Sequence, residues 1–226
     1  MSIDDDREAQ THAVSTRLRC QRRRNATASS RLTLLAIRED TVAISPVDQK
    51  LIGVISETLQ NAPIILGAFN QVGHDQNVGF TLAAACAMVQ KESGGRMIWG
   101  ADPWNEAAFP KGAALDPALH EQPVTAANYH AYAARRDAGM QPQGCGITQL
   151  TSPSPQKQAD QAGGCFAPFA NAVTGFQFLR AQFEAGGSEQ AGFRNYNGSG
   201  PAAEAYADAA VALAAEWQSR INQALA

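Results

Sequence analysis

Signals that start and stop helices recur from residue 45 to residue 223, and this pattern constrains the fold more than any other feature of the chain. At the first of them, Ser45 is placed to cap a helix whose first residue is Pro46, and Asp48 lies three residues after the cap. Apolar residues then recur near the helical period until Pro63, at Val47, Leu51, Val54 and Leu59. This stretch predicts a helix of about four turns.

The same periodicity predicts five further helices, over residues 78–92, 125–139, 154–162, 168–185 and 201–223. The first of these is rich in alanine, which lets a neighbouring backbone approach closely, and its apolar face carries Val78, Leu82, Ala85, Cys86 and Val89. Thr125 is expected to cap the next helix, with Val124 packed on Tyr129 beside the cap. The apolar faces of the last two helices consist of Phe169, Val173, Phe176 and Phe183, and of Tyr206, Ala210, Leu213, Trp217 and Ile221.

Only one short segment is typical of a strand. It is GCGITQLT, residues 144–151, which is bounded by glycine. Residues 94–124 contain four prolines and four glycines and predict a loop. The expected fold class is therefore mainly α, a helical domain with a small β or loop lobe.

Charge divides the chain into a basic head and an acidic body. Residues 1–40 carry eight arginines against six acidic residues, while residues 41–226 carry ten basic and fifteen acidic residues. The head has neither interleaved aromatic residues nor a helical face that would organise its arginines for nucleic acid. We therefore predict a basic, disordered extension over residues 1–44, a folded domain over residues 45–226, and no nucleic-acid partner.

Cysteine and histidine spacing argues against a metal site. The four cysteines and four histidines form neither a CxxC nor an HExxH pattern, so no metal is expected. Cys145 and Cys165 lie in glycine-rich loops, and whether they form a disulfide stays open. No run of about 18 apolar residues occurs, so no membrane span is expected. The acidic start, MSIDDDREAQ, is unlike a signal peptide.

Glu92 is an unexpected charge at the end of the alanine-rich helix. It follows Val89 by three residues and Ala85 by seven, so its side chain leaves the apolar face. A carboxyl beside a cleft loses hydration in its charged form, which raises its pKa toward the range useful to a general acid. A solvated helix end is the alternative, although a carboxylate there opposes the helix macrodipole. Glu92 is therefore the candidate for protonating a leaving-group oxygen.

Three segments in order resemble the lysozyme-like superfamily: ESGG at 92–95, GCGITQLT at 144–151 and NYNGSGPAAEAYA at 195–207. The resemblance covers residues 78–222 and is to lytic transglycosylases and goose-type lysozymes, most closely to lysozyme-like domains in endolysins of phages infecting actinobacteria. It implies an α+β lysozyme-like fold with a substrate cleft. It also implies a catalytic Glu92, a G-x-x-Q segment lining the cleft, and a Tyr-Asn-Gly segment opening the last helix.

The matched residues also suit a sugar ligand by their own chemistry. The amide of Gln149 can donate to and accept from N-acetyl and hydroxyl groups. Tyr196 offers a flat face to a sugar and a hydroxyl that can bond to the Glu92 carboxyl. Asn197 orders the turn before a helix that starts at Pro201. We expect Glu92 to be catalytic and the substrate-binding residues to be Ser93, Gln149, Tyr196, Asn197 and Asp102.

The resemblance implies a peptidoglycan glycosidase that cleaves the bond between N-acetylmuramic acid and N-acetylglucosamine without a cofactor. In the favoured interpretation it is a lytic transglycosylase in which Glu92 acts first as acid and then as base. Goose-type enzymes carry a second carboxylate just after the G-x-x-Q segment, where this chain has Thr151. The alternative is a muramidase in which Asp102 assists Glu92, because hydrolysis generally uses two carboxyl groups.

Two other classes stay open. One is a cysteine amidopeptidase with Cys145 as nucleophile and His120 or His130 as base. The other is a non-catalytic virion or wall-binding protein. For the favoured glycosidase the expected partner is the peptidoglycan glycan strand, and the protein is expected to be a monomer. Because this substrate lies outside the membrane, a phage lysin released through a holin, or carried in the virion, is the expected setting.

Overall fold

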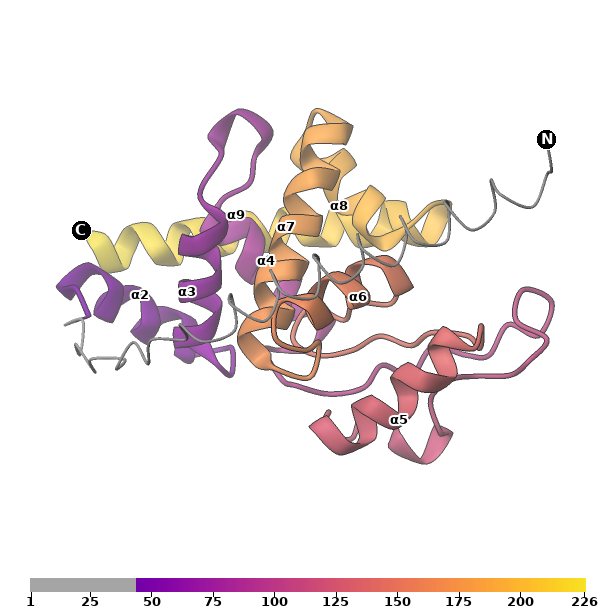
Figure 1. Cartoon of the computed structure of the whole chain (residues 1–226). Helices are drawn as coiled ribbons and strands as arrows, with labels where there is room; N and C mark the ends of the chain where they lie inside the picture. Colours follow the sequence, from indigo (N-terminus) through magenta and orange to yellow (C-terminus); the bar gives the residue numbers. More distant parts are fainter. Residues whose placement is uncertain (1–43) are drawn as a thin grey trace, which may run out of the picture. The chain divides into compact units, whose positions relative to one another are not determined.

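The computed structural model describes residues 44–226, and these residues fold mainly into α-helices (Figure 1). The extension predicted over residues 1–44 lies outside this part of the chain, apart from Ile44. Between residues 44 and 226 there are four isolated β-bridges and no strand, so the mainly α class is confirmed. The eight described α-helices are α2 (Pro46–Ser56), α3 (Ala62–Val72), α4 (Leu82–Glu92), α5 (Ala126–Asp137), α6 (Pro153–Gln161), α7 (Pro168–Gly186), α8 (Glu189–Asn197) and α9 (Pro201–Leu225).

The first helix is shorter than predicted, and a second helix follows it. Ser45 caps α2 as expected, since its hydroxyl accepts a hydrogen bond from the backbone N–H of Asp48 at 3.0 Å. The helix ends at Ser56, and Pro63 lies in the first turn of α3. Val47, predicted to face the core, is 53% exposed. Helix α3 was not predicted, because it packs against several helices and is apolar on most sides, so it lacks a clear helical periodicity.

Helix α4 is the most buried helix of the larger core. It begins at Leu82 because Thr81 accepts a hydrogen bond from the backbone N–H of Ala84 at 3.1 Å, whereas Val78 belongs to a separate 3₁₀ turn. Every residue from Leu82 to Val89 is buried, so the prediction of a single apolar face is wrong. The short alanine side chains let α9 pack closely against this helix, while α3 contacts it over a smaller area.

Two hydrophobic cores hold the described residues together. The larger core joins α2, α3, α4, α7, α8 and α9. Its largest fully buried side chains are Ile55, Ile65, Phe80, Met88, Ile147, Phe176, Phe183, Phe193 and Trp217. The smaller core forms around α5 and the loops near it, with Trp99, Leu115, Tyr129 and Tyr132 at its centre. Figure 1 shows α5 and these loops on one side of the other helices. The smaller core therefore consists of loops, α5 and Ala159 of α6, and we call this region the loop lobe.

The segment predicted as a strand, residues 144–151, is a series of turns, so that prediction is wrong. Gly146 and Gln149 have φ angles of 82° and 47°, in the left-handed region that strands do not use. A single isolated bridge between Trp99 and Cys145 is the strand-like pairing of this segment.

In the loop lobe, side-chain amides of glutamine make the hydrogen bonds to the backbone that a neighbouring strand would make in a sheet. Gln143 accepts a hydrogen bond from the backbone N–H of Asp102 at 3.0 Å and donates one to the backbone carbonyl of Asp102 at 2.9 Å. Gln141 donates to the backbone carbonyl of Pro103 at 2.9 Å. Both glutamines are buried, so these contacts satisfy polar groups that water does not reach. They fix the backbone on either side of Asp102.

Asn171 of α7 connects the turn segment to the larger core. Its side chain is fully buried. The amide oxygen accepts hydrogen bonds from the backbone N–H and the hydroxyl of Thr148, both at 3.1 Å. The amide nitrogen donates to the backbone carbonyls of Cys145 at 2.9 Å and Cys165 at 3.3 Å. The amide therefore has partners on both of its ends.

The last helices follow the prediction closely, with one addition. Helices α6, α7 and α9 begin and end within two residues of their predicted bounds. Val173, Phe176 and Phe183 are buried as predicted, but Phe169 is 45% exposed. Helix α8 was not predicted, because Gly192 interrupts its pattern; a Cβ there would overlap the Phe183 ring. None of the described helices is long and apolar enough to cross a membrane.

Helix α5 begins as the sequence predicts. Thr125 caps it by accepting a hydrogen bond from the backbone N–H of Asn128 at 3.3 Å, and Asn128 in turn accepts one from the backbone N–H of Thr125 at 2.8 Å. Val124 and Tyr129 are both buried in the smaller core. Gly139, where the helix was predicted to stop, lies two residues after its end and has a φ angle of 86°.

Candidate functional site

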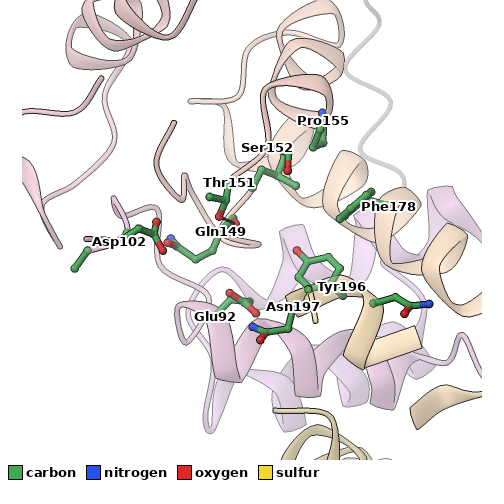
Figure 2. A pocket seen from close by; sticks show the side chains of 14 residues that line it. Glu92, Asp102, Gln149, Thr151, Ser152, Pro155, Phe178, Tyr196 and Asn197 are labelled. Carbon is green, nitrogen blue, oxygen red and sulfur yellow. Dashed lines mark hydrogen bonds between the residues drawn. The ribbon is translucent and has the colours of Figure 1, made fainter. Parts of the chain in front are cut away.

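A cavity of about 500 Å³ lies where the ends of α4 and α8 meet two loops (Figure 2). The loops are residues 100–102 and 149–152, and helices α6 and α7 complete the wall. The cavity brings together Glu92, Asp102, Gln149, Tyr196 and Asn197, which are five of the six residues predicted from the sequence. The other lining residues are Gly100, Ala101, Leu150, Thr151, Ser152, Pro155, Phe178, Asn195 and Gly198.

Glu92 is the last residue of α4, and the chain turns sharply after it. Gly94 and Gly95 have φ angles of 65° and 81°, which end the helix. A Cβ on Gly95 would overlap the backbone of Gln60, so only glycine fits there. The backbone N–H of Gln60 donates to the carbonyl of Gly94 at 3.0 Å. The turn between α2 and α3 therefore holds the end of α4 in place and aims the Glu92 carboxyl into the cavity (Figure 2).

The environment of Glu92 favours its protonated form. Burial raises the pKa of Glu92 to about 7, while a hydrogen bond from Tyr206 and the positive charge of Lys91 oppose the rise. The negative charge of Asp102 raises the pKa further. The hydroxyl of Tyr206 donates to Glu92 Oε1 at 2.5 Å. A carboxyl with this pKa can both give and take a proton near neutral pH.

Tyr206 is a site residue that sequence reasoning placed in the core. It lies on α9, 114 residues after Glu92. The ammonium group of Lys91 lies 4.7 Å from the centre of its ring, in a cation–π contact. The neighbouring inward residues of α9 are alanines. A lone inward hydroxyl on such a face needs a polar partner, and this signal could have shown that Tyr206 belongs to the site.

Replacing Tyr206 by phenylalanine removes the one hydrogen bond that lowers the pKa of Glu92. We expect the pKa of Glu92 to rise further. The measurement is an NMR titration of the Glu92 carboxyl in Tyr206→Phe and in the parent protein from pH 5 to 9. An unchanged midpoint would show that this hydrogen bond does not set the protonation of Glu92.

Asp102 enters the cavity from the loop lobe. Its carboxylate oxygen Oδ2 accepts a hydrogen bond from the backbone N–H of Gly144 at 3.0 Å. The two backbone contacts of Gln143 fix its main chain. A carboxylate held in this way has one oxygen engaged by the protein and lines the same cavity as Glu92. It is therefore placed to bind a polar ligand or a water molecule in the cavity.

Gln149 has a left-handed backbone and an amide that is partly engaged. Its Nε2 atom donates to the backbone carbonyls of Ile98 at 3.0 Å and Gly146 at 2.8 Å. The Oε1 atom has room only because Gly100 and Gly144 lack side chains. A Cβ would lie 2.8 Å from Oε1 at Gly100 and 2.5 Å from it at Gly144. Gln149 therefore presents an acceptor to the cavity, while its donor positions the loop.

Tyr196 does not make the hydrogen bond that was considered for it. Its hydroxyl donates to the backbone carbonyl of Thr148 at 2.6 Å, and the partner of Glu92 is Tyr206. Its ring lines the cavity. Burial raises the pKa of Tyr196 well above its ordinary value, and the charge of Glu92 adds to this effect. Tyr196 therefore acts as a neutral hydrogen-bond donor that anchors α8 to the turn segment.

Asn197 lies at the end of α8, so the Tyr-Asn-Gly segment closes a helix and does not open the last one. Gly198 and Gly200 follow with φ angles of 128° and 85°. Pro201 then begins α9, as predicted. The side chain of Asn197 lines the cavity and is exposed. Its amide is accessible to a ligand.

Ser93 is buried beneath the cavity and does not line it. Its hydroxyl donates to the backbone carbonyl of Ile147 at 2.6 Å and accepts from the backbone N–H of Gly95 at 3.1 Å. These two contacts connect the end of α4 with the turn segment. The hydroxyl of Ser93 therefore supports the backbone at the end of α4 and is not part of the cavity wall.

Cys145 and Cys165 are both buried and carry free thiols. Their side chains are neighbours, and Cys145 Sγ lies 3.8 Å from the backbone oxygen of Cys165. Burial raises the pKa of Cys145 well above its ordinary value. A nucleophilic cysteine needs an accessible thiolate, so this geometry argues against the amidopeptidase hypothesis.

Comparison with models of protein families, with curated proteins and with solved structures gives no match for this chain. The function must therefore be argued from the chemistry of the cavity.

Proposed function

We propose that this chain is a peptidoglycan glycosidase in which Glu92 is the general acid and base. The observation that supports the proposal most is a partly buried carboxyl with a pKa of about 7 at the wall of a cavity of about 500 Å³. A cavity of this size accommodates sugar rings, and its polar groups suit their hydroxyl and acetamido substituents. The order of the three sequence segments that resemble lysozyme-like enzymes agrees with this chemistry.

In the proposed reaction, the protonated Glu92 gives its proton to the glycosidic oxygen between N-acetylmuramic acid and N-acetylglucosamine. The bond from the muramyl C1 to that oxygen breaks, and an oxocarbenium-like centre develops at C1. The Glu92 carboxylate then takes the proton of the muramyl C6 hydroxyl, and O6 bonds to C1 to close a 1,6-anhydro ring. Glu92 ends the cycle protonated, so a single carboxyl suffices. The hydrogen bond from Tyr206 holds the carboxyl between the two steps.

A muramidase is the second candidate, and the position of Asp102 favours it. Both carboxyl groups line the same cavity, and the charge of Asp102 affects the pKa of Glu92. In this reaction Asp102 would orient a water molecule toward C1 in place of the C6 hydroxyl. We favour the transglycosylase, because one oxygen of Asp102 already accepts a backbone N–H.

Mass spectrometry of digested cell walls separates the two reactions. We expect muropeptides that end in 1,6-anhydro-muramic acid, each lighter by one water molecule than a hydrolysed product. Reducing-end muramic acid would identify a muramidase. Walls that yield no soluble muropeptides, with the protein still bound to them, would show a wall-binding protein without glycosidase activity.

A further inference from the structure

Two cysteines meet in the loop lobe from segments that are 20 residues apart in the chain. Cys145 belongs to the turn segment, and Cys165 belongs to the loop between α6 and α7. Both side chains are fully buried, and the thiol of Cys145 donates to the backbone carbonyl of Cys165 at 3.8 Å. The Cys145 thiol also lowers the pKa of Cys165 by hydrogen bonding to its sulfur, although burial opposes this shift. The two sulfur atoms are therefore neighbours.

The backbones of both cysteines are fixed in this position. The amide nitrogen of Asn171 donates to the carbonyls of Cys145 at 2.9 Å and Cys165 at 3.3 Å, and it lies 3.4 Å from the Cys165 sulfur. The carbonyl of Cys145 also accepts from the backbone N–H of Leu150 at 3.1 Å. The backbone N–H of Cys165 donates to the carboxylate of Asp160 at 3.2 Å. One buried amide thus holds the two cysteines side by side.

A glycine next to each cysteine makes this approach possible. Gly146 has a φ angle of 82°, and a Cβ there would lie 2.4 Å from the Asn171 side chain. Gly164 has a φ angle of 111°, and a Cβ there would lie 2.3 Å from the ring of Phe166. A side chain at either position would displace a segment that carries one of the cysteines. The contact between the two thiols therefore depends on the local sequence on both sides.

Cys86, the third cysteine of the described residues, has a different environment. It lies in the middle of α4, in the larger core, between the buried residues Ala85 and Ala87. Burial raises the pKa of Cys86 well above its ordinary value. Its thiol therefore stays protonated and behaves as a small apolar group. Cys145 and Cys165 share the other core, where each thiol has the other as a hydrogen-bonding neighbour.

We propose that Cys145 and Cys165 are a redox pair that closes to a disulfide under oxidising conditions. This site is independent of the proposed glycosidase function. With oxidised glutathione as the oxidant, the Cys165 thiolate attacks one sulfur of the glutathione disulfide and releases one glutathione thiolate. The Cys145 sulfur then attacks the Cys165 sulfur of the mixed disulfide and releases the second glutathione. The protein loses two electrons and two protons, and two molecules of reduced glutathione form.

The disulfide closes a loop of chain that contains part of the cavity wall. Residues 149–152 line the cavity and lie between the two cysteines, as does the whole of α6. The carbonyl of Thr148, which anchors Tyr196, belongs to the same loop. A disulfide stabilises a folded protein chiefly by restricting the unfolded chain. Oxidation should therefore raise the melting temperature by about 5 to 10 °C.

The test oxidises the full chain while it refolds in a glutathione buffer, because both thiols are buried in the folded protein. Trypsin cleaves after Lys157, between the two cysteines, so the disulfide joins two separate peptides, residues 137–157 and 158–180. Mass spectrometry should find these two peptides linked, and a reducing agent should separate them. Melting curves recorded with and without reducing agent measure the stabilisation.

Cys145→Ala and Cys165→Ala should each melt at the same temperature with and without reducing agent. Cys86→Ala is the matched control, because it removes a buried thiol that is not part of the pair. This variant should keep the full difference in melting temperature between its oxidised and reduced forms. The peptide map of the parent protein decides the question even if an alanine variant does not fold.

Unlinked peptides from the refolded parent protein overturn the proposal, as does a disulfide from Cys145 or Cys165 to Cys20. Equal melting temperatures of the oxidised and reduced parent protein also overturn it. Neither measurement uses wall cleavage. A failure of the glycosidase function therefore leaves the result for the cysteine pair unchanged, and a failure of the cysteine pair leaves the glycosidase function unchanged.

Discussion

We expect Glu92→Gln to lower the rate of the proposed wall cleavage by at least about 10²- to 10⁴-fold, the usual contribution of general acid catalysis. The amide keeps the size of the side chain and can still accept the hydrogen bond of Tyr206, but it has no proton to transfer. Turbidity loss on purified walls measures the effect. Glu106→Gln, an exposed loop residue outside the cavity wall, should cleave at the parental rate. Parental activity in Glu92→Gln would remove Glu92 from the mechanism.

The same variant should be as stable as the parent or more stable, with a defined dependence on pH. The pKa of Glu92 is about 7 in the folded protein against 4.5 ordinarily, so between these values the unfolded chain loses a proton that the folded protein keeps. The parent therefore loses stability as the pH rises from 4.5 to about 7. The difference in melting temperature between Glu92→Gln and the parent should be small near pH 4.5, grow toward pH 7 and then level off. A difference that is constant across this range would contradict the raised pKa.

Replacing Asn171 by alanine lowers the free energy of unfolding by about 3 to 5 kcal/mol, because several buried partners lose hydrogen bonds worth about 1 to 3 kcal/mol each when left unsatisfied. These partners include the backbone N–H of Thr148 and the carbonyls of Cys145 and Cys165. At about 2 to 4 °C per kcal/mol, the melting temperature falls by about 10 °C.

Gln177→Ala is the control for this change. Gln177 lies on the same helix, is exposed, and has one side-chain contact, with the exposed Gln158. Its replacement should change stability by no more than about 0.5 kcal/mol. Wall cleavage by Asn171→Ala should also fall at temperatures where the variant is folded, because the turn that carries Gln149 loses its support. Equal melting temperatures for Asn171→Ala and Gln177→Ala would show that Asn171 does not support this turn.

The local signals of the sequence predict the helices well. Caps at Ser45 and Thr125 and the proline at Pro201 set the starts of α2, α5 and α9, because capping depends on residues a few positions apart. Helices α3 and α8 were missed because one is apolar on most sides and the other contains Gly192. Helices α3 and α8 form because they pack against other helices, and the periodicity of apolar residues carries no information about such packing.

The candidate site was predicted in its composition but not in its contacts. Five of the six predicted residues line one cavity. They lie at or near the ends of helices and turns that local sequence signals predict. Tyr196 was considered either as a surface for a sugar or as the hydrogen-bond partner of Glu92, and that partner is Tyr206. Both tyrosines lie near the same end of the chain, and only the way α9 crosses α4 decides which hydroxyl reaches the carboxyl. Likewise, the buried position of Ser93 depends on the turn at Ile147, which was predicted as a strand.

The contact between α4 and α9 has a consequence for the order in which the molecule matures. Helix α9 provides the hydrogen bond to Glu92 and also bonds α4 through Trp217 and Gln90, which are 127 residues apart. In a chain emerging from the ribosome, α4 is synthesised long before α9. Until α9 is made, the face of α4 that α9 buries is exposed. Closing so long a loop is among the slower steps of folding. The buried environment that raises the pKa of Glu92 therefore forms only after α9 has been synthesised. In a nascent chain without α9, Glu92 is an ordinary solvated carboxylate.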